Sequence, residues 1–502
     1  MEDYLIGVDI GTSSSKALAV SLKGKILAET GQRYATLHPQ PDHSEQDPVL
    51  VAEVVIRIIG QLIRKQGRDP MGISFSAAMH SLMAVDRSGR PLTPLLLWSD
   101  TRSSGEAMAL RSERSLAKRI YDHTGTPIHA MSPLCKLLWW QKHQPAMWKK
   151  AARFIGIKEY ICWLLTGEYV IDHSLASATG LFDLRRLKWY EPALNKAGID
   201  KSHLSAPVSS MQSFRVQQAV YRKKLHLRSD VPLVIGASDG CLANLGSGAI
   251  RPGDLAITVG TSGAVRMLSH KPLSDPRQSL FCYLLTEQEY VIGGAINNGG
   301  GLLDWYTQQI DEDAPGKEEY DDFMRTALSA PPGSEGLLFL PYLLGERSPV
   351  WDGFARGAYV GIDIRHSRAH FMRALLEGIS FALKGIGGEV ERQGGKVKQV
   401  IASGGFTKAP GWVQMLADMI GKPVQVSSDA DASSLGAVMM GGVALGCWKN
   451  WKEATSFLKT VKTYQPERHS HRQYERLYPL YASLYEALKD QLHALAAFQS
   501  TG

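Results

Sequence analysis

The feature that most constrains the fold is an order of predicted elements that occurs twice along the chain. Alternating apolar residues predict strands over 4–9, 14–21 and 25–30, each separated from the next by a short turn. Helical apolar spacing follows over 49–65, and another apolar strand is predicted over 71–77. The first part of the chain is therefore predicted to form three strands, a helix and a strand.

The same order restarts in the second half of the chain. Strands are predicted over 254–259 and 264–268, a hairpin crosses 286–289, a helix lies near 298–310 and an apolar strand covers 336–340. A repeated plan of this kind predicts two related α/β domains that face each other across a cleft. Clefts between domains are favoured ligand sites because their closure excludes water.

Turns of small residues follow predicted strands at three places. They are Gly11-Thr12-Ser13, Gly260-Thr261-Ser262-Gly263 and Ser403-Gly404-Gly405-Phe406. Glycine lets backbone N–H groups approach phosphate oxygens, and the hydroxyls add donors without bulk. One such turn is equally typical of an ordinary hairpin, but three of them favour a nucleotide-binding protein. The pattern G-x-x-x-x-G-K-[ST] is absent from the sequence, which excludes a P-loop enzyme.

Two isolated carboxylates stand at the ends of apolar runs. Asp9 closes the first predicted strand beside the first turn, where a hard oxygen ligand could hold Mg²⁺ directly or through water. Asp239 lies on a turn of small residues just before the second half, and a partly desolvated carboxylate there suits a general base that takes a proton from a hydroxyl. Taken alone, each is better explained as an aspartate that caps a turn. Beside the glycine turns, the catalytic interpretation is favoured.

Polar residues gather at four places in the first half. They are Met79-His80-Ser81, Trp98-Ser99-Asp100-Thr101-Arg102, Lys158-Glu159 and Asp172-His173-Ser174. Dense, fixed donors and acceptors suit a polyol, and a sugar acid adds the need for a cation. For His80 alone, a core histidine with satisfied hydrogen bonds is the better interpretation.

The composition excludes several classes of protein. The 56 Lys and Arg against 49 Asp and Glu give a net charge of +7, and the basic residues are scattered, so nucleic acid is not an expected partner. The 5 cysteines form no C-x-x-C pair, which favours reduced thiols over disulfides or a zinc site. The longest apolar run, 435–448, is shorter than the ~20 residues that cross a bilayer. Because the acidic N-terminus also lacks the basic flank of a signal peptide, we expect a cytoplasmic protein with no membrane partner.

Two longer motifs resemble the signatures of the FGGY carbohydrate kinases. The first covers 131–143, with the sequence MSPLCKLLWWQKH, and the second combines 357–362 with 370–377. The resemblance runs from the Asp9 turn to roughly Gly446. It implies an α/β fold of two actin-like, ribonuclease H-like ATPase domains of similar topology that flank a catalytic cleft.

The resemblance also implies domain boundaries. The sugar-binding domain would span 1–247 and the nucleotide-binding domain 248–446. Residues 447–502 would then form a helical tail packed on the second domain.

The resemblance further implies a role for each turn. ATP and Mg²⁺ are the expected cofactors, with Asp9 organising the metal. The residues expected to contact or border the nucleotide are Thr12, Ser13, Ser14, Lys16, Gly260, Thr261, Gly300, Asp304, Gly405 and Ala409. On the other side, Met79, His80 and Asp239 would line the sugar, with Asp239 as the base. Glycerol kinases of the family carry Arg and Glu where this chain has Met79 and His80, which argues against glycerol.

Within the family, the short motifs resemble the branch that phosphorylates gluconate. Among them are SAAMHS at 76–81, TGTPIHAMSPL at 124–134 and TVGTSGAVR at 258–266. We therefore expect ATP-dependent phosphorylation of the terminal hydroxyl of D-gluconate to 6-phospho-D-gluconate. The expected substrate residues also include Arg102, Lys158, Asp172 and His173. Our hypothesis is that some of His80, Arg102, Lys158 and His173 face the substrate carboxylate, and surface ion pairs are the alternative for Arg102 and Lys158.

Two other functions stay open at this point. One is a kinase for xylulose or for another ketose or polyol. The other is a non-catalytic actin-like ATPase or sugar sensor, against which Asp239 and the polar sugar-side residues argue, because a protein that only switches on ATP does not need them. The patterns leave the oligomeric state open, a homodimer included.

Overall fold

The computed structural model describes residues 2–273, 275–310, 318–427 and 431–499. Contacts divide the chain into a first unit of Met1–Ile250, Ser269–Val291 and Ala430–Leu458 and a second unit of Arg251–Leu268, Ile292–Asp429 and Lys459–Gly502. The chain therefore passes between the units several times. The division predicted from the sequence, by contrast, is contiguous, with boundaries at 247 and 446.

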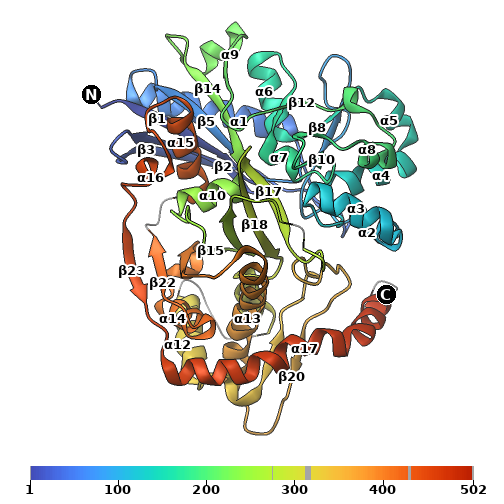
Figure 1. Ribbon diagram of the computed structural model, residues 1–502, viewed down its shortest axis with the longest axis vertical. Coiled ribbons are helices and arrows are strands. Elements are labelled where there is room, and N and C mark those ends of the chain that lie inside the picture. Colours follow the sequence, from blue (N-terminus) through green and yellow to red (C-terminus); the bar gives the residue numbers. More distant parts are fainter. Residues whose placement is uncertain (1, 274, 311–317, 428–430, 500–502) are drawn as a thin grey trace. The chain divides into compact units, whose positions relative to one another are not determined.

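The first unit is built on a six-stranded sheet of order β13-β14-β5-β1-β2-β3 (Figure 1). The strands are β1 Tyr4–Ile10, β2 Ser14–Ser21, β3 Ile26–Arg33, β5 Gly72–Ala77, β13 Ser213–Arg215 and β14 Pro232–Ser238. β1 pairs antiparallel with β2 and parallel with β5, and β14 also pairs parallel with β5. The carboxyl ends of β1, β5 and β14 therefore meet at one edge of the sheet. All four strands predicted in the first 77 residues are confirmed.

Helix α1, Pro48–Gln66, begins and ends at residues that cap it. The Asp47 carboxylate accepts hydrogen bonds from the N–H groups of Val49 and Leu50, and Gly67 ends the helix in the left-handed region at a φ of 70°. The helix packs on β2 and β3. The helix predicted over 49–65 is thereby confirmed.

Two further helices complete the support of this sheet. α10, Asp239–Gly246, packs on α15, Ala432–Ala444, and α15 packs on β1 and β5. Glycines permit the close approach: a Cβ on Gly436 would lie 2.0 Å from the carbonyl oxygen of Leu242, and one on Gly7 would lie 2.1 Å from that of Ser434. α15 belongs to the first unit for this reason.

The second sheet has seven strands in the order β17-β18-β16-β15-β21-β22-β23, and all of them except the edge strand β17 repeat the plan of the first sheet. The strands are β15 Asp254–Val259, β16 Gly263–Ser269, β17 Phe281–Thr286, β18 Glu289–Ile296, β21 Gln399–Ser403, β22 Val424–Ser427 and β23 Thr460–Tyr464. β15 pairs antiparallel with β16 and parallel with β21, as β1 does with β2 and β5. Helix α13, Arg368–Gly394, precedes β21 as α1 precedes β5.

The parallel partner of β15 is not the strand predicted over 336–340, so that part of the predicted repeat is wrong. The segment contains β19, Leu338–Leu340, which pairs with β20, Ala358–Val360, in a separate two-stranded sheet. Apolar content identifies both β19 and β21 as strands. It does not show which of them joins the main sheet, because that depends on long-range pairing.

The remaining elements surround the two sheets (Figure 1). In the first unit they are β4 Glu45–Gln46, β6 Met83–Val85, β7 Leu95–Leu96, α2 Ser104–Ser112, α3 Arg114–Thr124, α4 Pro133–His143, α5 Pro145–Lys150, β8 Arg153–Ile155, α6 Ile157–Thr166, β9 Val170–Asp172, α7 His173–Ser177, β10 Phe182–Asp183, β11 Lys188–Trp189, α8 Glu191–Ala197, β12 Ala206–Val208, α9 Ala219–Lys224 and α16 Trp451–Ala454. In the second they are α11 Gly301–Gln309, α12 Glu318–Ser329, α14 Pro410–Ile420 and α17 Arg468–Gln499.

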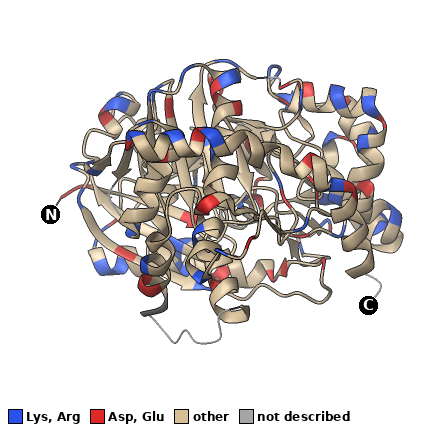
Figure 2. Ribbon diagram, turned by 90° about the horizontal axis from the view of Figure 1, so that it is seen from below, with Lys and Arg blue, Asp and Glu red and all other residues tan. Residues whose placement is uncertain are grey.

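Charged residues of both signs are interspersed along the ribbon (Figure 2). This matches the scattered basic residues of the sequence. Across the described ranges, no helix has the length and apolar character needed to cross a membrane.

Candidate functional site

Four predicted site residues meet at the carboxyl edge of the first sheet. Asp9 of β1 pairs in register with Ser76 of β5, and Ser238 of β14 pairs with Ala77. The turn that carries Met79 and His80 follows β5 directly, and Asp239 follows β14. Because parallel strands present their carboxyl ends at the same edge, ligands of α/β proteins bind at such positions.

Asp9 lies in a strongly acidic environment. Its Oδ1 accepts a hydrogen bond of 2.6 Å from the Ser76 hydroxyl. Burial first, and then the charges of Asp431 and Asp239, raise the pKa of Asp9 to about 8. Lys16 pairs with Asp9 across β1 and β2, but its Nζ lies 2.8 Å from Oδ2 of Asp431. Negative charge therefore exceeds positive charge around Asp9.

This donor set fits a hard divalent cation such as Mg²⁺. Such an ion takes oxygen ligands, keeps several waters and is commonly held by one or two carboxylates together with substrate phosphates. In the part of the chain that the structure describes, no three His, Cys, Asp or Glu side chains form a group that could hold a metal ion. A metal at this site would be held by Asp9, with coordination positions left for waters and substrate phosphates.

The turn after β1 is held by two residues that the sequence did not predict. The Tyr34 hydroxyl donates to the carbonyl of Gly11 at 2.5 Å, and the Gln46 side-chain amide donates to the carbonyl of Thr12. These bonds occupy the carbonyls of the turn. Thr12 and Ser14 are partly exposed and Ser13 is exposed, so their hydroxyls are accessible to a phosphate.

His80 adopts a conformation that is unusual for a residue other than glycine. Its φ is 66°, in the left-handed region. Its Nδ1 donates to the carbonyl of Ala178 at 2.8 Å, because a carbonyl oxygen can only accept, and its ring lies 5.9 Å from that of Tyr283. In the neutral imidazole Nε2 is then the acceptor nitrogen.

Asp239 occupies the first position of α10 and is partly exposed. Its Oδ1 accepts a hydrogen bond of 2.7 Å from the Gly240 N–H, which restrains the carboxylate. The preceding strand bulges between Val234 and Ala237, where Gly236 has a φ of 71°. A Cβ at Gly236 would lie 1.8 Å from the carbonyl oxygen of Phe75, so the bulge that leads to Asp239 requires glycine.

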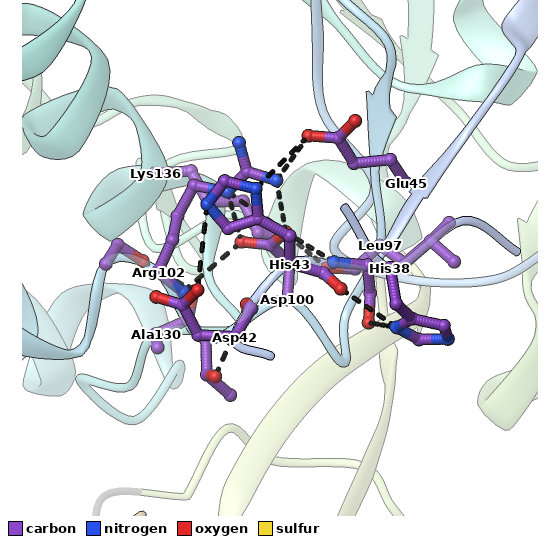
Figure 3. Close-up of polar contacts among 12 residues, drawn as sticks. His38, Asp42, His43, Glu45, Leu97, Asp100, Arg102, Ala130 and Lys136 are labelled. Carbon is purple, nitrogen blue, oxygen red and sulfur yellow. Dashed lines mark hydrogen bonds and ion pairs between the residues drawn. The ribbon is translucent and has the colours of Figure 1, made fainter. Parts of the chain in front are cut away.

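Arg102 and Lys158 form ion pairs, but these pairs are buried rather than at the surface. The Arg102 guanidinium lies 2.7 Å from Asp100 and 2.5 Å from Glu45. Figure 3 draws the three side chains and their contacts. The Lys158 ammonium lies 2.7 Å from Oδ2 of Asp172 and also donates to the carbonyl of Ala237 at 2.9 Å. The surface alternative is therefore wrong for both. Neither side chain brings an uncompensated positive charge to a substrate.

His173 is paired with a carboxylate from a distant part of the sequence. Its Nδ1 lies 3.1 Å from Oε1 of Glu287, which follows β17. The hydrogen bond to His173 is the main cause that lowers the pKa of Glu287 to about 2. No local pattern linked these two residues.

The His173–Glu287 pair leads to a prediction about acid stability. Because the pKa of Glu287 lies below its ordinary value of 4.5, the ionised carboxylate stabilises the fold above that pH, and this contribution is lost as the pH falls from 4.5 toward 2. We expect Glu287→Gln to lower the free energy of unfolding by roughly 1 kcal/mol at pH 6, since the side chain is partly exposed. The deficit should shrink at pH 3.5 in denaturant titrations. A deficit that is independent of pH would contradict the assignment.

The glycine turns of the second unit border a pocket of about 450 Å³. Five predicted nucleotide residues line it, namely Gly260, Thr261, Gly300, Asp304 and Gly405. The Gly300 N–H donates to the carbonyl of Gly260 at 2.7 Å. This bond joins the residues before α11 to the turn between β15 and β16. Among the other lining residues, the sequence did not predict Tyr320, Asp321, Lys408 and Trp412. Ala409 is buried at the N-cap of α14 and does not line this pocket.

Gly405 offers a test of this pocket. A Cβ at Gly405 would meet no atom within 4 Å, so a larger side chain there costs the fold little and projects into open space. We expect Gly405→Val to raise the KM for ATP by about 10-fold through lost pocket volume while leaving the KM for the sugar unchanged. Gly388→Ala, whose Cβ also meets nothing within 4 Å, is the matched control. An unchanged KM for ATP in Gly405→Val would show that the nucleotide binds elsewhere.

Similarity to known proteins extends over nearly the whole chain. Residues 4–246 match the N-terminal domain of the FGGY family of carbohydrate kinases, and residues 255–445 match its C-terminal domain. A gluconokinase of Bacillus licheniformis is 38% identical over 507 residues, which cover 99% of this chain and 99% of that protein. Two solved structures from Lactobacillus acidophilus, one titled a gluconate kinase and one a ligand-bound xylulose kinase, each align with a TM-score of 0.92 and 34% identity. Each alignment covers 97% of this chain and 98% of the other.

Proposed function

The chain belongs to the FGGY family of carbohydrate kinases, and from this membership we propose that it transfers the γ-phosphoryl group of ATP to the terminal hydroxyl of D-gluconate. The product is 6-phospho-D-gluconate. The observation that carries the proposal is the meeting of Asp9, His80 and Asp239 at one sheet edge, in a chain 38% identical to a gluconokinase.

Asp239 is the general base of the proposed reaction. Its carboxylate takes the proton of the terminal hydroxyl as the hydroxyl oxygen attacks the γ-phosphorus in line. The hydrogen bond from the Gly240 N–H fixes the orientation of this carboxylate at the start of α10.

The turns bind the phosphates. The hydroxyls of Thr12, Ser13 and Ser14 donate to phosphate oxygens, and Lys16 adds positive charge beside them. In the second unit, the residues around Gly260 form the nucleotide pocket. When bound, Mg²⁺ would be held by Asp9 and would supply positive charge to the phosphate oxygens. Positioning and electrostatics supply most of the rate in such a transfer.

Arg102, Lys158 and His173 are each already paired with a carboxylate of the protein. Asp100 and Glu45 compensate the Arg102 charge, Asp172 compensates that of Lys158, and Glu287 pairs with His173. The Nε2 of His80 is suited to accept a hydrogen bond from a sugar hydroxyl. We therefore assign His80 to the sugar hydroxyls and assign none of these residues to the substrate carboxylate.

A substrate panel tests the proposal. ADP release should be measured with ATP and Mg²⁺ in the presence of gluconate, xylulose, ribulose or glycerol. We expect gluconate to give the highest kcat/KM. A preference for xylulose would replace gluconate with the substrate named for one of the Lactobacillus acidophilus structures. ADP release that no sugar stimulates would favour the non-catalytic ATPase or sensor.

A further inference from the structure

Lys136 is a buried cation that the proposed reaction does not use. It lies on α4 within the first family signature, and its side chain has no exposed surface. Its Nζ donates to the carbonyl of His80 at 2.6 Å and to the carbonyl of Leu97 at 2.6 Å. Burying a lysine amine costs folding free energy unless the amine is hydrogen-bonded. The two carbonyls that accept its hydrogen bonds therefore indicate the role of Lys136.

The two acceptors belong to two different polar turns. His80 belongs to the turn after β5, and Leu97 directly precedes the turn 98–102. Lys136 and Leu97 lie beside the cluster of Arg102, Asp100 and Glu45 (Figure 3). One amine therefore joins the backbones of both turns from the interior of the first unit.

The His80 conformation needs such support. A left-handed φ at a residue other than glycine costs of order 1–3 kcal/mol and persists only where the surroundings determine it. Nδ1 is fixed by the carbonyl of Ala178, and the backbone carbonyl is fixed by Lys136. With both ends held, the imidazole has one defined position.

We propose that Lys136 is a positioning residue of the sugar site, which holds the strained His80 so that its imidazole meets the sugar. This inference rests on the proposed function, because it takes His80 to contact the sugar. Lys136 acts through the His80 backbone and does not itself contact the substrate.

The two-carbonyl arrangement works in either charge state of the amine. Burial is the main cause that lowers the pKa of Lys136 to about 7. The charge of Asp100 opposes this by raising the pKa, the charge of Arg102 lowers it further, and Cys135 raises it. An ammonium has three N–H donors and a neutral amine has two, and two carbonyls have to be satisfied. Lys136 is therefore a constant support near neutral pH, not a switch.

The test compares Lys136→Met, which fills similar space without a donor, with Lys142→Met on the same helix. Lys142 is exposed and pairs with Glu106 at 3.5 Å. We expect Lys136→Met to raise the KM for the sugar by about 10-fold, as the loss of a positioned group would. The KM for ATP should stay within about twofold of the wild type. Lys142→Met should change neither value.

A double-mutant cycle with His80→Ala shows whether Lys136 acts through His80. If it does, Lys136→Met/His80→Ala should have the same KM for the sugar as His80→Ala alone. If the KM for the sugar in the double mutant rose by the product of the two single-mutant factors, the proposal would be overturned. An unchanged KM for the sugar in Lys136→Met would also overturn it. Lys136→Gln keeps two N–H donors, so its KM for the sugar should lie between those of the wild type and Lys136→Met. If neither Lys136 variant folds, the role of the residue is purely structural and the proposal is overturned. If the wild-type protein phosphorylated no sugar, the proposed function itself would be contradicted, independently of the role of Lys136.

Discussion

Replacing Asp239 by asparagine is expected to lower kcat by at least ~10²-fold, the contribution of a general base. The amide keeps the size of the side chain and can still accept the hydrogen bond of the Gly240 N–H, so the start of α10 should be retained. It cannot accept the proton of the attacking hydroxyl. The KM for the sugar should change much less than kcat, because the loss falls on the transition state.

Steady-state kinetics with the preferred sugar of the panel would measure this effect. Asp230→Asn is a suitable control, since Asp230 is exposed and pairs only with Arg215 and Arg222 among the ion pairs of the described residues. Thermal unfolding should show the same transition for both variants and the wild type. Near-normal turnover in Asp239→Asn would remove Asp239 from its role as the base.

Local patterns predicted the parts of the fold that local physics determines. The strands β1, β2 and β5 and the capped helix α1 follow from periodicity and caps within a few residues. The FGGY resemblance and its two-domain α/β fold are confirmed by matches over both halves and by solved structures. Once the strand order is known, the meeting of Asp9 and Asp239 follows from the parallel pairing of β1, β5 and β14.

The rest depends on contacts between distant parts of the chain. Asp431 raises the pKa of Asp9 and binds Lys16, yet nothing near Asp9 in the sequence points to it. It is brought there by α15, whose glycines pack against α10 and β1. The sequence around Lys158 does not indicate its carboxylate partner either. Because Glu159 follows Lys158, the two residues resemble a surface ion pair, but the partner of Lys158 in the structure is Asp172.

Replacing Lys158 by methionine is expected to destabilise the first unit rather than to raise only the KM for gluconate. Lys158 and Asp172 are both buried, with Nζ and Oδ2 2.7 Å apart. Removing one partner of a buried ion pair leaves an uncompensated charge and costs roughly 3–5 kcal/mol. The lysine also holds the carbonyl of Ala237, two residues before Asp239, so kcat should fall in the enzyme that still folds.

Denaturant titration would measure the loss of stability. In Lys158→Met/Asp172→Asn the buried charge is gone and the amide can still accept the hydrogen bond of the Leu175 N–H, so about half of the lost stability should return. The control is Lys118→Met, at an exposed lysine that pairs with Asp122, and it should change the free energy of unfolding by no more than about 0.5 kcal/mol. A stable Lys158→Met variant whose only defect is a higher KM for gluconate would instead place the ammonium against the substrate carboxylate.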